Sequence, residues 1–172
     1  VTDAFAALVA GNAVVLRPDT LTSLTALRAV DILDQAGLPH GVLQVVLGSG
    51  ATIGQAVLDR ADYVCFTGST ETGREVAAGL GRRLVGVSLE LGGKNPLIVR
   101  RDADLRRTVP GALRGVFASG GQLCMSIERL IVDQHIEPAF TAQFARAVKA
   151  MRLGPELSFG YDMGSLLNAA QL

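Results

Sequence analysis

Segments typical of β-strands alternate with segments typical of helices along the first half of this chain, and this order constrains the fold more than any other feature. For example, a helix predicted at 23–36 can be capped by Thr22 or Ser23, and Gly37 and Pro39 end it. Strands that alternate with helices predict an α/β fold, with a parallel sheet whose apolar strands are buried by helices on both faces. The predicted elements are helices at 4–10, 23–36, 52–58 and 70–80, and strands at 13–16, 42–47 and 63–67.

The pattern changes after Gly81, where a glycine-bounded segment runs to Gly93. We place a domain boundary within this segment, so that residues 1–91 belong to one α/β domain and residues 92–172 begin a second. The elements predicted for the second domain are strands at 96–99 and 129–132, helices at 105–117 and 138–151, and a helix that begins within 163–170.

Charge and cysteine usage exclude several classes of protein. The 172 residues carry 16 Lys and Arg against 16 Asp and Glu, without a basic run, so neither nucleic acid nor an anionic membrane is an expected partner. No stretch approaches the roughly 18 to 20 apolar residues of a membrane helix. Two cysteines without CxxC spacing predict neither a disulfide framework nor a metal site, and favour a reducing compartment such as the cytoplasm. Because the sequence opens on Val inside a helical pattern, we interpret it as a fragment.

A Gly-Ser-Thr turn follows the predicted strand at 63–67 and opens the next helix. A glycine there, Gly68, lets backbone N–H groups approach a phosphate, and the helix N-terminus adds partial positive charge. The spacing is not GxGxxG, so an ordinary strand-to-helix turn with a Ser or Thr cap is the alternative.

Glu90 is a lone acid inside an apolar segment that ends in Gly92 and Gly93. Partial desolvation would raise the pKa of its carboxyl group toward a value useful for a general base. The ordinary alternative is an ion pair with Lys94 or Arg129 at the edge of the core.

Cys124 follows Gly120 and Gly121, two glycines that allow substrate and backbone to approach the cysteine closely. A thiolate there could attack an aldehyde to form a thiohemiacetal, from which hydride leaves to a nicotinamide. Free cysteines are more commonly small buried hydrophobes, and we expect that role for Cys65 within its apolar strand.

Taken together and in this order, the three stretches resemble those of the aldehyde dehydrogenase superfamily. Cys124 follows Glu90 by 34 residues (124 − 90), the usual interval in that family, and residues 10–18 are similar to its adenosine-binding strand. The stretch around Cys124 resembles a bacterial branch labelled succinate-semialdehyde dehydrogenase. The resemblance covers the whole chain and implies a Rossmann-like domain at 1–91, which binds the cofactor NADP or NAD, and the start of the catalytic domain at 92–172.

The resemblance also implies roles for individual residues. Cys124 would be the nucleophile, its N–H half of an oxyanion hole, and Glu90 the base that activates water to hydrolyse the thioester. Gln122 would shape the loop. Cofactor contacts would come from Arg17, Pro18, Asp19 and Thr20 at the adenosine, Gly68 and Ser69 at the pyrophosphate, Gly73 in helix packing, and Leu91 and Gly92 at the nicotinamide.

Three departures from the family pattern bear on cofactor, substrate and activity. Arg17 replaces the usual lysine and Thr20 a frequent glutamate, which predicts use of NADP at least equal to NAD. Ala118 stands where established succinate-semialdehyde dehydrogenases place an arginine, so an uncharged aldehyde is as plausible a substrate as succinate semialdehyde. The family's second oxyanion donor and its ribose-binding glutamate fall outside these residues, which predicts poor catalysis by the fragment alone.

Two other interpretations stay open. A CoA-acylating enzyme commonly lacks the base, so Glu90 favours the hydrolytic type, and a non-catalytic relative would be expected to have lost Cys124 or Glu90. By resemblance, the full-length protein is expected to be a homo-oligomer that acts on a small-molecule aldehyde.

Overall fold

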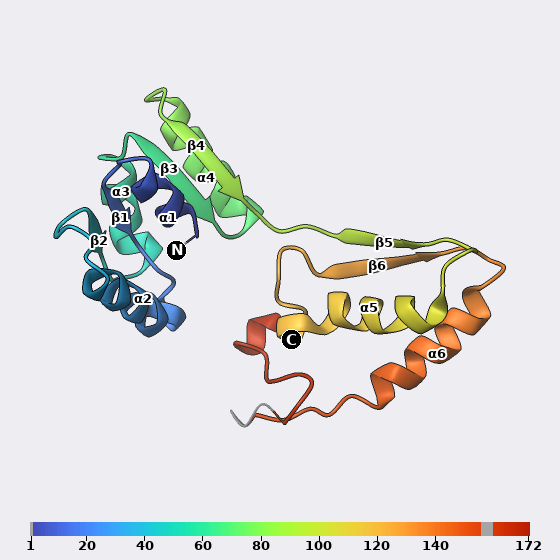
Figure 1. The fold of residues 1–172 in the computed structure, drawn as a ribbon. Coiled ribbons are helices and arrows are strands. Elements are labelled where there is room, and N and C mark those ends of the chain that lie inside the picture. Colours follow the sequence, from blue (N-terminus) through green and yellow to red (C-terminus); the bar gives the residue numbers. More distant parts are fainter. Residues whose placement is uncertain (1, 156–159) are drawn as a thin grey trace. The chain divides into compact units, whose positions relative to one another are not determined.

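The structure, a computed structural model, describes residues 2–155 and 160–172. These residues form two compact units, one that ends at Glu90 and one that begins at Leu91 (Figure 1). Each unit combines parallel strands with helices, so the predicted α/β class is confirmed.

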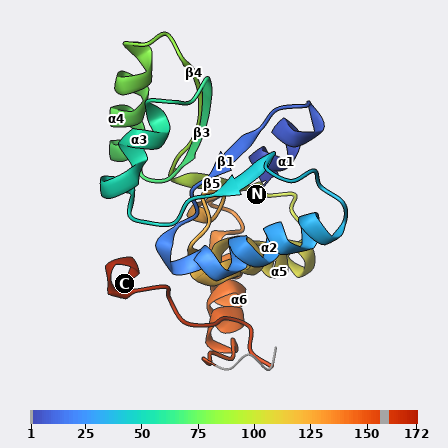
Figure 2. The ribbon, with the colours of Figure 1, turned by 90° about the vertical axis from the view of Figure 1, so that its left-hand side faces the viewer.

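The first unit holds two separate pairs of parallel strands. In order, its elements are α1 (Thr2–Val9), β1 (Val14–Leu16), the 3-10 turn η1 (Thr20–Thr22), α2 (Ser23–Gln35), β2 (Leu43–Val45), the π-helical turn η2 (Gly50–Gly54), α3 (Gln55–Leu58), β3 (Tyr63–Thr67), α4 (Thr70–Gly81) and β4 (Gly86–Glu90). β1 pairs with β2, and β3 pairs with β4 from Tyr63 opposite Gly86 to Thr67 opposite Glu90. α3 and α4 lie on one side of β3 and β4 (Figure 2).

The second unit is a strand pair covered by two helices. Its elements are β5 (Asn95–Val99), α5 (Leu105–Phe117), the 3-10 turn η3 (Ala118–Gly121), β6 (Ile127–Val132), α6 (Glu137–Lys149) and the 3-10 turn η4 (Ala169–Gln171). The two helices pack against each other and lie on the same side of the parallel pair β5 and β6 (Figure 1). The core between them is made by Val99, Val109, Ala112 and Phe140, and the Phe140 ring stacks on Phe144 with centroids 5.5 Å apart.

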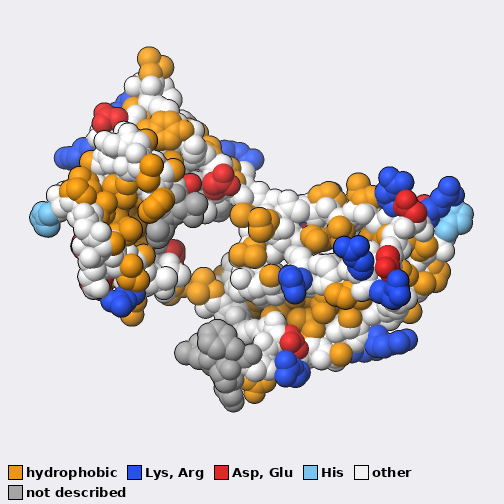
Figure 3. All heavy atoms as spheres, viewed as in Figure 1, with side chains coloured by type: hydrophobic (Ala, Val, Ile, Leu, Met, Phe, Trp, Pro, Cys, Tyr) orange, Lys and Arg blue, Asp and Glu red, His pale blue; other side chains and the backbone are white. Residues whose placement is uncertain are grey.

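The expected burial of the strands on both faces is wrong for these residues. Alternate side chains of β3 and β5 are exposed, with Tyr63 at 58% and Ile98 at 67%. In the second unit, for example, α5 and α6 cover only one side of β5 and β6, and hydrophobic side chains are visible on the surface of both units (Figure 3). Cys65 lies on the same face of β3 as Tyr63 and is exposed, which corrects its expected burial in the core.

Two further local predictions are wrong. The helix expected to begin within 163–170 is only the turn η4, because the backbone near Met163 bonds instead to the segment around Arg152. Neither Thr22 nor Ser23 caps α2 through its side chain. Asp19 accepts the N–H of Leu21 at 2.9 Å and so caps the preceding turn η1, whose residues lead directly into α2.

Candidate functional site

Cys124 stands on a β-turn between η3 and β6. The N–H of Ser126 donates to the carbonyl of Leu123 at 3.0 Å, which closes a turn with Cys124 and Met125 at its centre. The thiol residue is exposed, whereas Ser126 is 2% exposed and anchors the end of the turn. Within residues 2–155 and 160–172, the N–H of Cys124 donates no hydrogen bond, so it is free to meet an acceptor.

The loop that precedes Cys124 has an unusual backbone. Ser119, Gly120 and Gly121 all have positive φ, at 52°, 67° and 74°. A Cβ at Gly121 would approach the carbonyl oxygen of Val116 to 3.3 Å, so glycine suits both the conformation and the space. Ser119 holds a left-handed conformation that non-glycine residues adopt rarely, a form of strain that tends to occur at functional sites.

Gln122 ties this loop together through both ends of its amide. Its Nε2 donates to the carbonyl of Ser119 at 2.9 Å, and its Oε1 accepts the N–H of Leu167 at 2.8 Å. The amide is therefore occupied in shaping the loop, the role expected for it from the sequence.

Asn95, for which the sequence predicts no role, contacts the cysteine turn, by which we mean residues 123–126. Its Nδ2 donates to the carbonyl of Cys124 at 2.7 Å and to the carbonyl of Ser126 at 3.0 Å. A Cβ built on Gly93 would lie 3.7 Å from the same Cys124 oxygen. The start of β5 therefore lies directly against the backbone of the turn that carries the thiol.

Glu90 lies at the last position of β4, next to the Gly68 turn. Its carbonyl accepts the N–H of Gly68 at 3.0 Å, and its side chain is exposed, so the expected desolvation of this carboxylate is not observed. Lys94, one of its two alternative partners, forms an ion pair with Glu128 instead. Within the first unit the structure thus brings Glu90 and Gly68 together at the carboxyl ends of β3 and β4, where ligands of parallel sheets commonly bind.

The Gly68 turn leads into a capped helix N-terminus. Ser69 accepts the N–H of Thr72 at 3.2 Å and caps α4, while Gly73 is buried one turn into that helix. A Cβ on Gly68 would fall 2.6 Å from the Phe66 ring, so any larger residue would force that ring to move. The first turn of α4 keeps backbone N–H groups and the positive end of the helix dipole available to an anion.

The four residues predicted at the adenosine end follow β1. The Arg17 Nε donates to the carbonyl of Gly48 at 3.1 Å, which ties the end of β1 to the loop after β2. Pro18 is buried, Asp19 caps η1, and Thr20 is exposed at the start of that turn. The rest of the Arg17 guanidinium lies beside Gly50, where a Cβ would approach it to 3.8 Å.

A second capped turn, which the sequence analysis did not predict, follows β2. Ser49 accepts the N–H of Thr52 at 3.1 Å and caps η2, which follows β2 just as α4 follows β3. The signal was present as a repeat of Ser-x-x-Thr at Ser49–Thr52 and Ser69–Thr72. Two Ser-capped turns therefore follow parallel strands in the first unit.

The surroundings of Cys65 disfavour its thiolate form. Although the residue is exposed as a whole, partial burial of the thiol raises its pKa, and the nearby Asp3 carboxylate raises it further. Both effects favour the protonated form, which is the poorer nucleophile.

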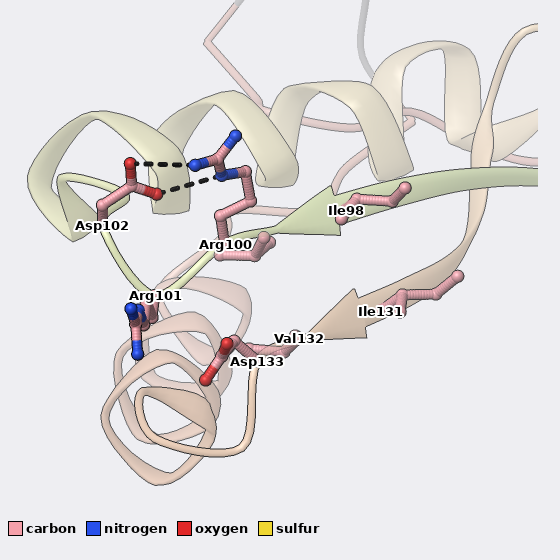
Figure 4. Close-up of a pocket in the computed structure, with 8 residues that line it drawn as sticks. Ile98, Arg100, Arg101, Asp102, Ile131, Val132 and Asp133 are labelled. Carbon is pink, nitrogen blue, oxygen red and sulfur yellow. Dashed lines mark hydrogen bonds and ion pairs between the residues drawn. The ribbon is translucent and has the colours of Figure 1, made fainter.

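A surface hollow lies elsewhere, beyond the carboxyl ends of β5 and β6. It holds about 550 Å³, and an ion pair between Arg100 and Asp102 crosses one side of it (Figure 4). No residue predicted to act in catalysis or cofactor binding lines it. Its walls combine aliphatic side chains with charged ones and hold neither cysteine nor histidine, so we assign no chemistry to it.

Two kinds of feature are absent from the described part of the chain. No three His, Cys, Asp or Glu side chains gather there as they would around a metal ion. No helix there has both the length and the apolar character required to cross a bilayer.

Comparisons with known proteins extend over the whole chain. The family model described as "Aldehyde dehydrogenase family" matches residues 1–172, which confirms the resemblance seen in the sequence. A protein of Mycobacterium tuberculosis named "Putative succinate-semialdehyde dehydrogenase (NADP+) 2" is 49% identical over 172 residues, which are 100% of this chain and 33% of that protein. This chain therefore spans about a third of the length of that relative.

Solved structures agree in fold. An NADP-dependent enzyme from E. coli superimposes with a TM-score of 0.92 at 36% identity, over 96% of this chain and 35% of its own. A betaine aldehyde dehydrogenase from Staphylococcus aureus, in complex with NAD+, gives a TM-score of 0.86 at 31% identity, over 92% of this chain and 32% of its own.

Proposed function

We propose that this chain, which belongs to the aldehyde dehydrogenase family, is the part of an NAD(P)-dependent enzyme that carries its nucleophile, Cys124, and its general base, Glu90. The observation that carries the proposal is the cysteine turn: an exposed thiol on a constrained β-turn, whose own N–H lacks an acceptor among the described residues. Residues 1–91 would belong to the cofactor-binding domain and residues 92–172 to the catalytic domain.

The chemistry follows from these groups. The Cys124 thiolate attacks the aldehyde carbon, and the free N–H of Cys124 stabilises the oxyanion that forms. The nicotinamide, when bound, supplies the acceptor for the hydride that leaves the thiohemiacetal, and a thioester remains on Cys124. Glu90 removes a proton from water, whose oxygen attacks the thioester, so that the carboxylic acid leaves and the thiol is regenerated.

Several features of the first unit suit a dinucleotide. The Ser69-capped N-terminus of α4 offers N–H groups to a pyrophosphate, and the lack of a side chain at Gly68 keeps that turn close to the Phe66 ring. Gly73 permits close packing of α4, and Leu91 and Gly92 would border the nicotinamide.

We propose that the enzyme uses NADP at least as well as NAD. The guanidinium of Arg17 could meet a 2′-phosphate, and Thr20 brings no carboxylate to repel it. The name of the mycobacterial relative includes NADP, which supports this choice. Measurement of kcat/KM for both cofactors tests the proposal. A preference for NAD above about tenfold, equivalent to about 1.4 kcal/mol, would refute it.

The substrate class is proposed as a small aliphatic aldehyde, with succinate semialdehyde as the first candidate because of the name of the same relative. A panel that pairs succinate semialdehyde with a neutral aldehyde of equal length decides the matter. Selectivity for succinate semialdehyde of tenfold or more would support a dicarboxylate enzyme, whereas equal turnover would remove that idea.

Replacement of the two cysteines tests the proposed nucleophile. In the enzyme that carries this segment, Cys124→Ala should abolish aldehyde oxidation and leave cofactor binding intact. Cys65→Ala is the matched control and should keep at least half of the activity. Dehydrogenase activity that survives Cys124→Ala would overturn the assignment. A product released only when CoA is supplied would favour the acylating alternative.

A further inference from the structure

The side chain of Asn95 bridges two backbone carbonyls of the cysteine turn. Its Nδ2 donates to two carbonyls at once, 2.7 Å from the oxygen of Cys124 and 3.0 Å from that of Ser126. These two bonds join residues 29 and 31 positions apart in the chain, so they fix the turn relative to the start of β5 rather than stabilising it locally.

The strand register explains why Asn95 is in position to do this. Asn95 lies opposite Ile127 but Pro96 lies opposite Arg129, so Glu128 is an extra, unpaired residue on β6. Such a bulge bends the strand and re-aims the groups beside it. Lys94 forms an ion pair with Glu128 at the same place and holds the two strands together across the bulge.

The orientation of the Cys124 carbonyl matters to the thiol. Because the peptide unit is planar, a hydrogen bond to this carbonyl fixes the ψ angle of Cys124. Backbone angles in turn decide which χ1 rotamers the side chain can adopt, and hence the direction of the Sγ atom. Nucleophilic attack is sensitive to such placement, since an error of about 1 Å can lower a rate by about 100-fold.

From this geometry we infer that Asn95 is a positioning residue of the reaction: its amide clamps the carbonyls of Cys124 and Ser126 and so orients the nucleophile. The inference rests on the proposed function of Cys124. Asn95 acts through the backbone of the turn and needs no contact with substrate or cofactor. Its amide must donate, so a carboxylate of the same shape cannot replace it.

Three substitutions in the enzyme that carries this segment test the role. Asn95→Ala removes the clamp, and Asn95→Asp keeps its shape but replaces the donor with an acceptor that repels both carbonyls. Both should lower kcat by about 10- to 100-fold while the dissociation constant for the cofactor changes less than twofold. Asn95→Gln restores a donor on a longer side chain and should recover more activity than either.

A second measurement separates positioning from mere structural support. The rate of alkylation of Cys124 by iodoacetamide, followed on its own peptide by mass spectrometry, should fall for Asn95→Ala and Asn95→Asp across the pH profile. Gln143→Ala, which removes an exposed amide from α6, should leave the rate and kcat unchanged.

The outcomes distinguish this inference from the proposed function. If Cys124→Ala abolishes oxidation while Asn95→Asp keeps kcat within twofold, the clamp is unnecessary and the inference fails alone. If Cys124→Ala retains oxidation, the proposed function itself fails. Should Asn95→Ala not fold, the contrast between Asn95→Asp and Asn95→Gln still decides, because equal losses in both would contradict a role for the donated hydrogen bonds.

Discussion

Truncation of Phe140 should destabilise the second unit strongly, and this loss of stability tests the core that the structure shows. The Phe140 side chain is 2% exposed, belongs to the core with Val99, Val109 and Ala112, and stacks on Phe144. Truncation to alanine removes a nearly fully buried ring and leaves a cavity between α5, α6 and β5, for which the typical cost is about 3 to 5 kcal/mol. That is a large part of the roughly 5 to 15 kcal/mol by which a domain is stable.

Hydrogen exchange followed by mass spectrometry measures the loss of local stability in the helices that surround Phe140. Since each 1.4 kcal/mol is a factor of ten in an equilibrium constant, Phe140→Ala should reduce protection of the α5 and α6 amides by about 100-fold or more. Gln143→Ala, on the exposed face of the same helix, is the control and should change stability by no more than about 0.5 kcal/mol. Protection within threefold of the unsubstituted protein would show that Phe140 is not a core residue.

Three further predictions concern single groups. Ser126→Ala should raise the melting temperature, because the buried Oγ has no hydrogen-bond partner among the described residues and burial of such a group costs about 1 to 3 kcal/mol; a lower melting temperature would show that the hydroxyl has a partner. Ser69→Ala should weaken α4 by about 1 kcal/mol through loss of its cap, seen as faster exchange in its first turn, and unchanged exchange would refute the capping role. The backbone N–H and ring of His135 hold the pKa of Asp133 below its usual value, so this carboxylate stabilises the fold above about pH 3.8 and loses that effect as the pH falls through the lowered pKa; Asp133→Asn should flatten the acid limb of a stability profile, and an unaltered limb would contradict this.

The sequence predicted correctly those strands and helices whose ends are set by neighbouring residues, such as a glycine turn or a capping side chain. The strand at 63–67 and the helix at 105–117 have the predicted bounds, since an apolar run before a glycine turn and a capped apolar repeat are both legible in sequence. Asp104, which accepts the N–H of Arg106, caps that helix.

Features that depend on distant partners could not be predicted in this way. The bond from Asn95 to Cys124 joins residues 29 positions apart, and no periodicity in the sequence announces it. The strand predicted at 96–99 begins one residue earlier in the structure, because Asn95 joins β5 only through its pairing with Ile127 beside the bulge. Exposure of Cys65 likewise depends on what covers the second face of β3, which the strand's own apolar pattern does not specify.

In the candidate site, too, the sequence predicted the residues but not their surroundings in space. The interval between Glu90 and Cys124, with the Gly68 turn before them, pointed to a family that the comparisons then confirmed. The exposed state of Glu90 was not foreseen, because desolvation of a carboxylate depends on its neighbours in space rather than on the apolar residues beside it in sequence.

The most direct test of the central claim is to trap the covalent intermediate on Cys124. In the enzyme that carries this segment, Glu90→Gln should slow hydrolysis of the thioester, so that incubation with aldehyde and cofactor accumulates an acyl group on the enzyme. Mass spectrometry of the digested protein should find that group on the peptide with Cys124 and leave Cys65 unmodified. An acyl group on another residue, or turnover by Glu90→Gln at the unsubstituted rate with no adduct on Cys124, would contradict the account.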